Sequence, residues 1–247
     1  MSTAWATAYA VKHYVRRLGG LFMKSAIAKQ HARQLQLPGF AYYFGGRGSV
    51  LGEVDSDVVT ATFGFFPAEL VGEHWSVARR TAPPAQFRAH YLRTCHTWAA
   101  EHLGAFKEAE QLGALLEKVT SAASPTLLPL FAGWRSVPLP GDPAARVAQL
   151  AHVLREHRGG LHLCAVRACG ITPVDAIRTR EDGDRRAAFL GWRSPGAPPD
   201  ASLVQLREHV ERVTDDLTAP AYEVLDEAEL KDLQTLLEAA YRHAVPS

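Results

Sequence analysis

Prolines and glycines interrupt this chain at intervals that leave room for helices, and apolar residues recur at helical spacing between them. The segment 227–243 shows the pattern most clearly, because its apolar residues fall on one face of a helix. Those residues are Leu230, Leu233, Leu236, Leu237 and Tyr241. Residues 4–18 repeat the pattern and are followed by Gly19 and Gly20, which favour a helix end. The spacing therefore predicts a mainly α protein.

Five prolines lie between positions 124 and 143 and indicate a connector between two parts of the chain. We therefore expect a two-lobed protein with three regions along the sequence. These are an N-terminal helical half (1–123), a proline-rich connector (124–142) and a C-terminal helical half (143–247).

Two local patterns in the C-terminal half add detail to this prediction. A helix starting at Pro143 should end near His157, because two glycines follow shortly afterwards. A shorter helix should then cover 161–168. Further along, the dipeptide Asp182-Gly183 between two short runs is typical of a hairpin turn, so we expect one small β-hairpin there.

Charge and cysteine content narrow the classes of partner. The chain has 27 Lys+Arg against 26 Asp+Glu, a net charge of +1, whereas proteins that bind nucleic acid usually carry a basic excess. Cys95, Cys164 and Cys169 lack the paired spacing of disulfides or zinc knuckles and fit reduced thiols. The apolar run from Ala4 to Val11 fits neither a signal peptide nor a membrane span. We expect a cytoplasmic protein with no membrane partner, and binding to nucleic acid is disfavoured.

Three segments carry a family resemblance. They read Tyr-Phe-Gly-Gly-Arg-Gly-Ser-Val-Leu-Gly at 43–52, Leu-Arg-Glu-His-Arg-Gly-Gly-Leu-His at 154–162, and Glu-Arg-Val-Thr-Asp-Asp-Leu-Thr-Ala-Pro at 211–220. In order and spacing they resemble a largely actinobacterial family of uncharacterised proteins labelled helix-turn-helix-like. The resemblance covers roughly residues 40–240. It implies a bacterial protein with an N-terminal helical half and a C-terminal half resembling a degenerate MarR-type winged helix.

One stretch departs from the family pattern. The resemblance implies another helix and a wing-like turn between Gly191-Trp192 and the segment 211–220. Here the interval from Arg193 to Ser202 is mostly proline, glycine and alanine, so the segment expected to hold the recognition helix is missing. Reading of bases in the major groove depends on such a helix, and its loss weakens the inference of DNA binding.

Glu156, His157, Arg158 and His162 form the most prominent polar cluster. A neutral His157 or His162 would serve as a general base, with Glu156 orienting it and Arg158 holding an anionic group. The alternative is that these residues only stabilise the end of a helix, where positive side chains interact favourably with the helix dipole. Asp215, in the third family segment, is a candidate ion-pair partner for Arg158.

Arg47, flanked by glycines and preceded by Tyr43, is the second candidate site. An arginine beside aromatic rings suits a carboxylate or phosphate attached to a flat apolar group. The alternative is a tight turn between helices, in which the glycines supply positive φ angles.

Metal binding is not expected, and no cofactor is predicted. His90, His96 and His102 recur every six residues, which rotates successive side chains by about 240° around a helix, so they cannot share a metal. His152 and Glu156 are four apart, but two such residues are usually a surface pair.

Three functions remain open. The first is a protein that binds a small anionic or aromatic molecule between its lobes, with cofactor-independent acid–base catalysis as an extension. The second is a transcriptional regulator, in which arginines around the predicted hairpin contact DNA; they are Arg178, Arg180, Arg185 and Arg186. The third is a partner-binding helical protein with an exposed apolar stripe.

Overall fold

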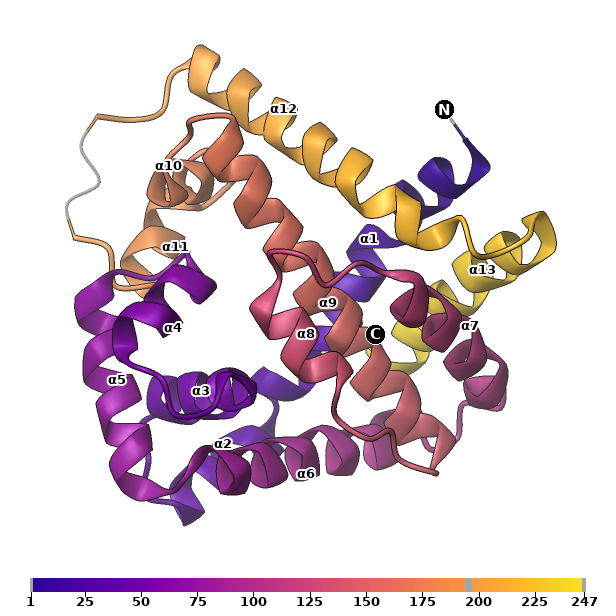
Figure 1. Ribbon diagram of the computed structural model, residues 1–247, viewed down its shortest axis with the longest axis horizontal. Helices are drawn as coiled ribbons and strands as arrows, with labels where there is room; N and C mark the ends of the chain where they lie inside the picture. Colours follow the sequence, from indigo (N-terminus) through magenta and orange to yellow (C-terminus); the bar gives the residue numbers. More distant parts are fainter. Residues whose placement is uncertain (1, 194–196, 246–247) are drawn as a thin grey trace.

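Helices account for all of the regular structure in residues 2–193 and 197–245, the part of the chain that the computed structural model describes. Thirteen α-helices and three short 3₁₀ helices follow one another along this part (Figure 1). The prediction of a mainly α protein is confirmed. None of these helices is both long and apolar enough to cross a membrane.

The first half of the chain contains two long helices, of 19 and 20 residues, and several shorter ones. Its elements are α1 (Thr3–Leu21), η1 (Phe22–Lys24), α2 (Ala26–Gln34), α3 (Gly39–Gly48), η2 (Ser49–Leu51), α4 (Ser56–Phe63), α5 (Ala68–Thr81), α6 (Pro84–Leu103) and α7 (Ala109–Ala122). Side-chain caps begin α1 and α2, because Ser2 accepts a hydrogen bond from Trp5 N and Ser25 accepts one from Ala28 N.

The second half is built around one helix of 26 residues, α9. Its elements are α8 (Pro129–Arg135), α9 (Pro143–Ala168), α10 (Pro173–Arg178), α11 (Gly183–Phe189), α12 (Ala201–Thr218), η3 (Ala219–Tyr222) and α13 (Glu227–Ala244). The last of these, α13, lies where the sequence predicted a helix, at 227–243. The predicted connector 124–142 contains α8, and the division into two lobes remains a prediction.

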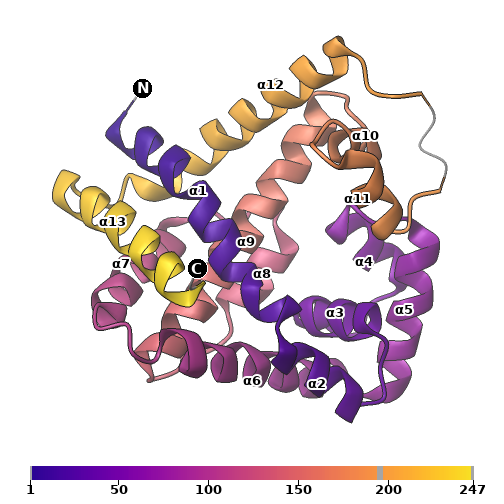
Figure 2. The same cartoon turned by 180° about the vertical axis from the view of Figure 1, so that it is seen from behind.

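The helix α9 crosses the middle of the molecule in both views (Figures 1 and 2). It packs against α1, α6, α7, α8 and α12. Asp142 caps its start by accepting a hydrogen bond from Ala145 N, and Pro143 occupies the first turn. One hydrophobic core includes residues from Ala4 to Ala244, so α9 is surrounded by apolar side chains from both halves of the sequence.

The predicted end of this helix near His157 is wrong. Gly159 and Gly160 lie inside α9, and the helix continues to Ala168. Glycine lowers helix propensity by about 1 kcal/mol, but burial of a helix on several sides outweighs such a local preference. Gly160 also has a packing role, because a Cβ atom there would lie 2.6 Å from Leu128 Cδ2.

The predicted β-hairpin is also wrong, because α10 and α11 flank the dipeptide Asp182-Gly183. Asp182 has φ 58, the left-handed conformation that Asp tolerates, and it precedes the first residue of α11. A Cβ atom at Gly183 would lie 2.1 Å from Arg178 O, so the turn between the two helices requires glycine there. A hydrogen bond of 2.7 Å from Arg178 Nε to Asp184 Oδ1 joins the helices.

The glycine-rich segment after Tyr43 is helical and belongs to α3. Its glycines allow close packing rather than positive φ angles: Cβ atoms at Gly45 and Gly46 would lie 2.7 Å from Phe87 and 2.2 Å from Tyr91. The expected positive φ occurs only after the helix, at Gly52 (φ 77). This tight packing against α6 fixes the position of Arg47.

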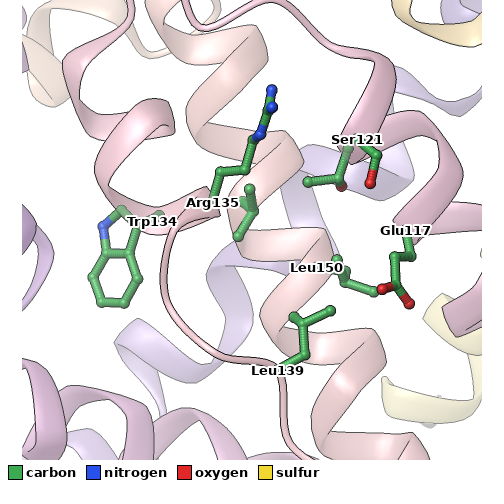
Figure 3. A pocket seen from close by; sticks show the side chains of 8 residues that line it. Glu117, Ser121, Trp134, Arg135, Leu139 and Leu150 are labelled. Carbon is green, nitrogen blue, oxygen red and sulfur yellow. The ribbon is translucent and has the colours of Figure 1, made fainter.

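Two of the hollows on the described part of the molecule lie beside helices of the core. One, of about 190 Å³, lies among α7, α8 and α9 (Figure 3). The other is wider, about 530 Å³, and lies between the segment 53–57 and Trp75, Ser76 and Arg79 of α5.

Candidate functional site

One face of α9 carries a row of polar or small residues where the helix passes the middle of the molecule. Arg155, Gly159 and His162 follow one another at spacings of four and three, so they lie on the same face. Glu156 borders this row. The row therefore combines a cation, a position without a side chain and a titratable ring.

Glu156 forms a buried two-pronged ion pair with Arg47 of α3. Arg47 Nε donates to Glu156 Oε1 at 2.9 Å, and Arg47 Nη2 donates to Oε2 at 2.7 Å. Arg155 Nη1 donates to the same carboxylate at 2.5 Å. Burial would raise the pKa of Glu156, but Arg47 and Arg155 hold it at about 2. The carboxylate is therefore fixed as an anion, and its first role is to join α3 to α9.

Aromatic side chains surround Arg47. The Arg47 Nη1 atom donates to Tyr43 Oη at 3.0 Å, and the guanidinium carbon lies 4.3 Å from the centre of the Phe63 ring. The sequence grouped Tyr43 with Arg47, and the structure brings Arg47 to Glu156. Because Arg47 already forms an ion pair with Glu156, its guanidinium is not free to bind an external anion.

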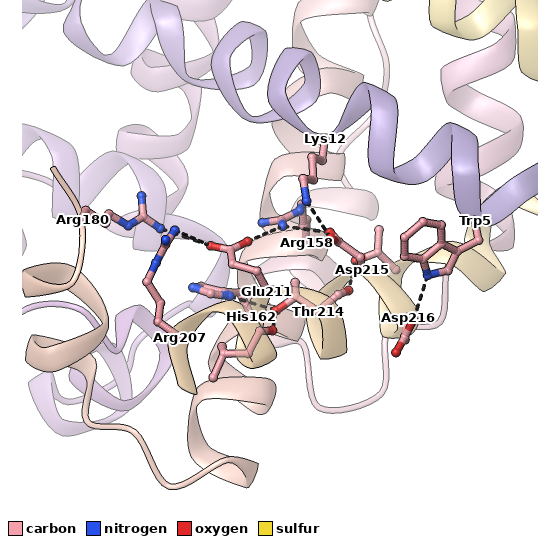
Figure 4. A network of polar contacts seen from close by, with 12 residues as sticks. Trp5, Lys12, Arg158, His162, Arg180, Arg207, Glu211, Thr214, Asp215 and Asp216 are labelled. Carbon is pink, nitrogen blue, oxygen red and sulfur yellow. Dashed lines mark hydrogen bonds and ion pairs between the residues drawn. The ribbon is translucent and has the colours of Figure 1, made fainter. Parts of the chain in front are cut away.

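A second ionic network lies where α1, α9 and α12 meet (Figure 4). Arg158 Nη2 donates to Glu211 Oε2 at 3.0 Å and to Asp215 Oδ1 at 3.2 Å. Lys12 Nζ reaches Asp215 Oδ2 at 2.6 Å. The pair between Arg158 and Asp215 that the sequence suggested is therefore present.

More positive side chains surround Glu211 than its single negative charge can neutralise. Arg207 and Arg180 lie 3.1 and 3.6 Å from its Oε1 atom, in addition to Arg158. Burial, with repulsion from Arg207, lowers the pKa of Arg180 to about 10. Burial also lowers the pKa of Arg16 on α1, which the charge of Arg158 lowers further. This part of the molecule therefore favours an added negative charge.

His162 lies beside these cations and is held in place. Its Nδ1 atom is 2.9 Å from Thr214 Oγ1, and its ring stacks on Phe65 with centroids 5.7 Å apart. Burial, joined by repulsion from Arg158, lowers the pKa of His162 to about 4 against the opposing effect of Glu211. The ring is therefore neutral at pH 7.

His157 faces in a different direction. Its ring centre lies 4.8 Å from that of Phe131 in α8, and burial lowers its pKa to about 4. Five residues separate it from His162, which turns the two side chains about 140° apart on a helix. The structure therefore does not bring His157 into the cluster, and Glu156 contacts Arg47 and Arg155 instead of orienting it.

Space beside this face of α9 is available at Gly159. A Cβ atom built there meets no atom within 4 Å, whereas at Gly160 it would meet Leu128. Gly159 lies between Arg155 and His162 on the same face. A ligand that lies against Gly159 thus has a cation on one side and a neutral imidazole on the other.

Two buried residues near this centre, Tyr91 and His152, were not predicted from the sequence as parts of the site. Tyr91 and His152 are both 1% exposed, and the Tyr91 hydroxyl has no hydrogen-bond partner in the described residues. Glu156 lies 3.8 Å from His152 Nδ1, so this pair, expected on the surface, is buried. Burial lowers the pKa of His152 to about 3. The four-residue spacing was the only local signal for the pair, and Tyr91 carried none.

Neither hollow on the described surface includes the candidate residues. The hollow of about 190 Å³ lies on another side of α9, and the wider one borders α4 and α5. The case for the cluster beside α9 therefore rests on its charges and on the space at Gly159. Within residues 2–193 and 197–245, no group of three His, Cys, Asp or Glu side chains is placed to hold a metal ion.

A family model described as a helix-turn-helix family matches residues 8–247. No curated protein matches the chain. No solved structure matches it either.

Proposed function

We propose that this chain, which belongs to the helix-turn-helix family, binds a small anionic molecule beside α9. The site lies against Gly159, between Arg155 and His162, and is bordered by the arginines near α12. A bacterial, cytoplasmic setting is part of the proposal. Membership of this family does not by itself fix the ligand, because one fold serves many functions.

The excess of positive charge around Glu211 carries the proposal. Four cations, Lys12, Arg158, Arg180 and Arg207, lie within 4 Å of only two carboxylates, those of Glu211 and Asp215. The Nε atoms of Arg158 and Arg207 are buried without a hydrogen-bond partner in the described residues. Buried guanidinium groups normally satisfy their donors, and a carboxylate or phosphate offers the matching acceptors.

The surroundings favour a ligand that also has a flat apolar part. Phe65 stacks on His162, while Tyr43 and Phe63 flank Arg47 on the α3 side of Glu156. The open position at Gly159 lies three residues after Glu156 and three before His162 on the same helix. A small aromatic carboxylate combines the two features, and benzoate is the simplest probe of that class.

Acid–base catalysis is an extension of this proposal. A neutral His162 can accept a proton from a bound ligand, and its contact with Thr214 fixes the ring orientation. His162→Gln should then preserve binding of benzoate while abolishing any proton transfer. Equal turnover of a substrate by this variant and the unsubstituted protein would remove His162 from that role.

Calorimetric titration with benzoate and its neutral analogue benzamide tests the binding site. We expect benzoate to bind at least tenfold more tightly, because only the anion balances the surplus charge, and charge-assisted hydrogen bonds contribute about 1.5–3 kcal/mol. Arg180→Gln should remove most of this preference, while Arg33→Gln on the exposed face of α2 should leave it unchanged. Gly159→Leu should block both ligands by filling the open space.

Equal affinity for benzoate and benzamide would overturn the proposal, as would unchanged binding in both Arg180→Gln and Gly159→Leu. Native mass spectrometry of freshly purified protein gives an independent readout. A reproducible extra mass that is lost in Gly159→Leu would identify the natural ligand of the same site.

Binding to DNA is the second candidate, favoured by the pair of short helices α10 and α11 in a chain of this family. Arg185 and Arg186 on α11 are exposed. However, α11 has seven residues, about 10 Å of helix, and Asp182 pairs with Arg185 at 2.6 Å. The short helix and the acidic neighbours weaken contact with a DNA groove.

This second candidate predicts affinity for duplex DNA that falls steeply as salt increases, because each phosphate contact releases counterions. Replacing Arg185 and Arg186 together by glutamine should make the slope of log affinity against log salt concentration shallower by about two, one for each lost phosphate contact. Negligible binding at low salt, or binding that is unaffected by the double substitution, would exclude the α11 surface as the interface.

A further inference from the structure

The hollow among α7, α8 and α9 is a candidate for a second binding site, independent of the function proposed above. Figure 3 shows Glu117 and Ser121 on one side, Leu139 at the lower edge and Leu150 of α9 behind them. Trp134 and Arg135 of α8 close the opposite side. Thr120 and Val153 complete the lining of this volume of about 190 Å³.

The lining of this hollow includes aliphatic side chains and two hydroxyl groups, those of the buried Thr120 and the exposed Ser121. Leu139, Leu150 and Val153 provide aliphatic surface. Thr120 is 5% exposed, and its Oγ1 atom has no hydrogen-bond partner in the part of the chain that the structure describes. Because buried hydroxyl groups are normally paired, Thr120 is ready to bond to a group that enters from outside.

The charged residues at the rim already have partners. Arg135 Nη1 donates to Ala123 O at 2.6 Å, and Glu117 lies 3.5 Å from Arg146 Nη2. One N–H donor of Arg135 is therefore already bonded to a backbone carbonyl, and the charge of Glu117 is balanced by Arg146. The wall therefore suits a neutral ligand that has one hydrogen-bonding group.

The size of the hollow limits the ligand to a single ring. An engineered protein cavity of about 150 Å³ binds benzene, and this hollow is slightly larger. We propose that it binds a neutral single-ring alcohol of the size of phenol, whose hydroxyl bonds to Thr120 and whose ring packs on Leu150 and Val153.

Trp134 connects this hollow to the ion pair on the other side of α8. Its indole points away from the hollow in Figure 3, and its Nε1 atom donates to Arg47 O at 3.0 Å. Arg47 in turn holds Glu156. Trp134 therefore borders the hollow and also contacts the residue of α3 that pairs with Glu156.

Titration with phenol and toluene, which have nearly the same shape, tests the site. If the phenol hydroxyl finds no hydrogen-bond partner in the hollow, phenol binds more weakly than toluene, because removing that hydroxyl from water is unfavourable. A hydroxyl that bonds to Thr120 instead makes phenol the tighter one, by roughly threefold to tenfold. We expect phenol to bind more tightly to the unsubstituted protein, as measured by calorimetry or ligand-observed NMR.

Two variants and a control complete the test. Thr120→Val should reverse the order, so that toluene binds more tightly than phenol, while Thr235→Val on the exposed face of α13 should preserve the original order. Leu139→Trp should abolish binding of both ligands by filling the hollow from its edge. Tighter toluene than phenol in the unsubstituted protein, an unchanged order in Thr120→Val, or undiminished binding in Leu139→Trp would each overturn the proposal.

Discussion

Gly159 and Gly160 are neighbours in α9 but have opposite surroundings. A Cβ atom at Gly159 meets nothing within 4 Å, while at Gly160 it would lie 2.6 Å from Leu128 Cδ2. Leu128 is 2% exposed and has little room to move. The first glycine therefore leaves a space open, and the second permits the helix to pack closely.

Alanine at these two positions should change stability in opposite directions. Gly159→Ala should raise the free energy of unfolding by about 0.5–1 kcal/mol, because alanine loses less conformational entropy in a helix interior. Gly160→Ala should lower it by roughly 1 kcal/mol or more, because the methyl group displaces Leu128. Urea denaturation of the two variants checks the contrast. The same change in both would contradict the difference in packing.

At the scale of elements, the pair between Arg47 and Glu156 joins α3 to α9 across 109 positions of sequence. Both side chains are buried, at 8% and 1% exposure. A buried ion pair is not in itself strongly stabilising, because desolvation offsets much of the attraction. Loss of one partner is different, since the other charge then remains buried and unpaired.

Glu156→Gln should therefore lower the free energy of unfolding by about 3 kcal/mol. The double variant Arg47→Met with Glu156→Leu should lose clearly less than Glu156→Leu alone, because no buried charge is left without a partner. Denaturant unfolding of these variants measures the coupling. Additive losses in the double variant would show that the two side chains act independently.

At the scale of the whole molecule, buried neutral histidines link the fold to pH. Burial lowers the pKa of His152 to about 3 and those of His157 and His162 to about 4, below the ordinary value of 6.5. In the unfolded chain these rings take up protons near pH 6.5, but in the folded protein they do so only near pH 3–4. Protonation therefore favours unfolding as the pH falls below about 6.5.

Stability should accordingly fall by several kcal/mol between about pH 7.5 and pH 5. Glu156 and Glu211 add a further loss below about pH 4.5, because their pKa values of about 2 in the folded state lie below the ordinary value of 4.5. His157→Leu should reduce the loss between pH 7.5 and pH 5 by roughly 1–2 kcal/mol.

Urea denaturation at the two pH values measures this loss. His209→Leu, which replaces an exposed histidine on α12, is the matched control. A pH dependence that His157→Leu leaves intact would show that its ring is not kept neutral by burial.

Local signals predicted much of the helical pattern. The helices at 4–18 and 227–243 were recognised because their apolar residues recur at helical spacing, which is visible in the local sequence. The stretch expected to lack a recognition helix includes residues 194–196, which lie outside the described part of the chain. The β-hairpin predicted at Asp182-Gly183 was wrong. Close packing of Gly183 on Arg178 forms a turn between two helices there instead.

The sequence by itself determined a helical chain and a set of polar residues on α9, because helical periodicity and charge are local properties. Tertiary structure decided which of those residues meet. It paired Arg47 with Glu156, directed His157 toward Phe131 and brought Arg180 to Glu211. It also continued α9 through its two glycines. The physical reason is that burial and long-range pairing involve residues far apart in sequence, so their free energies outweigh local preferences without leaving a local signal.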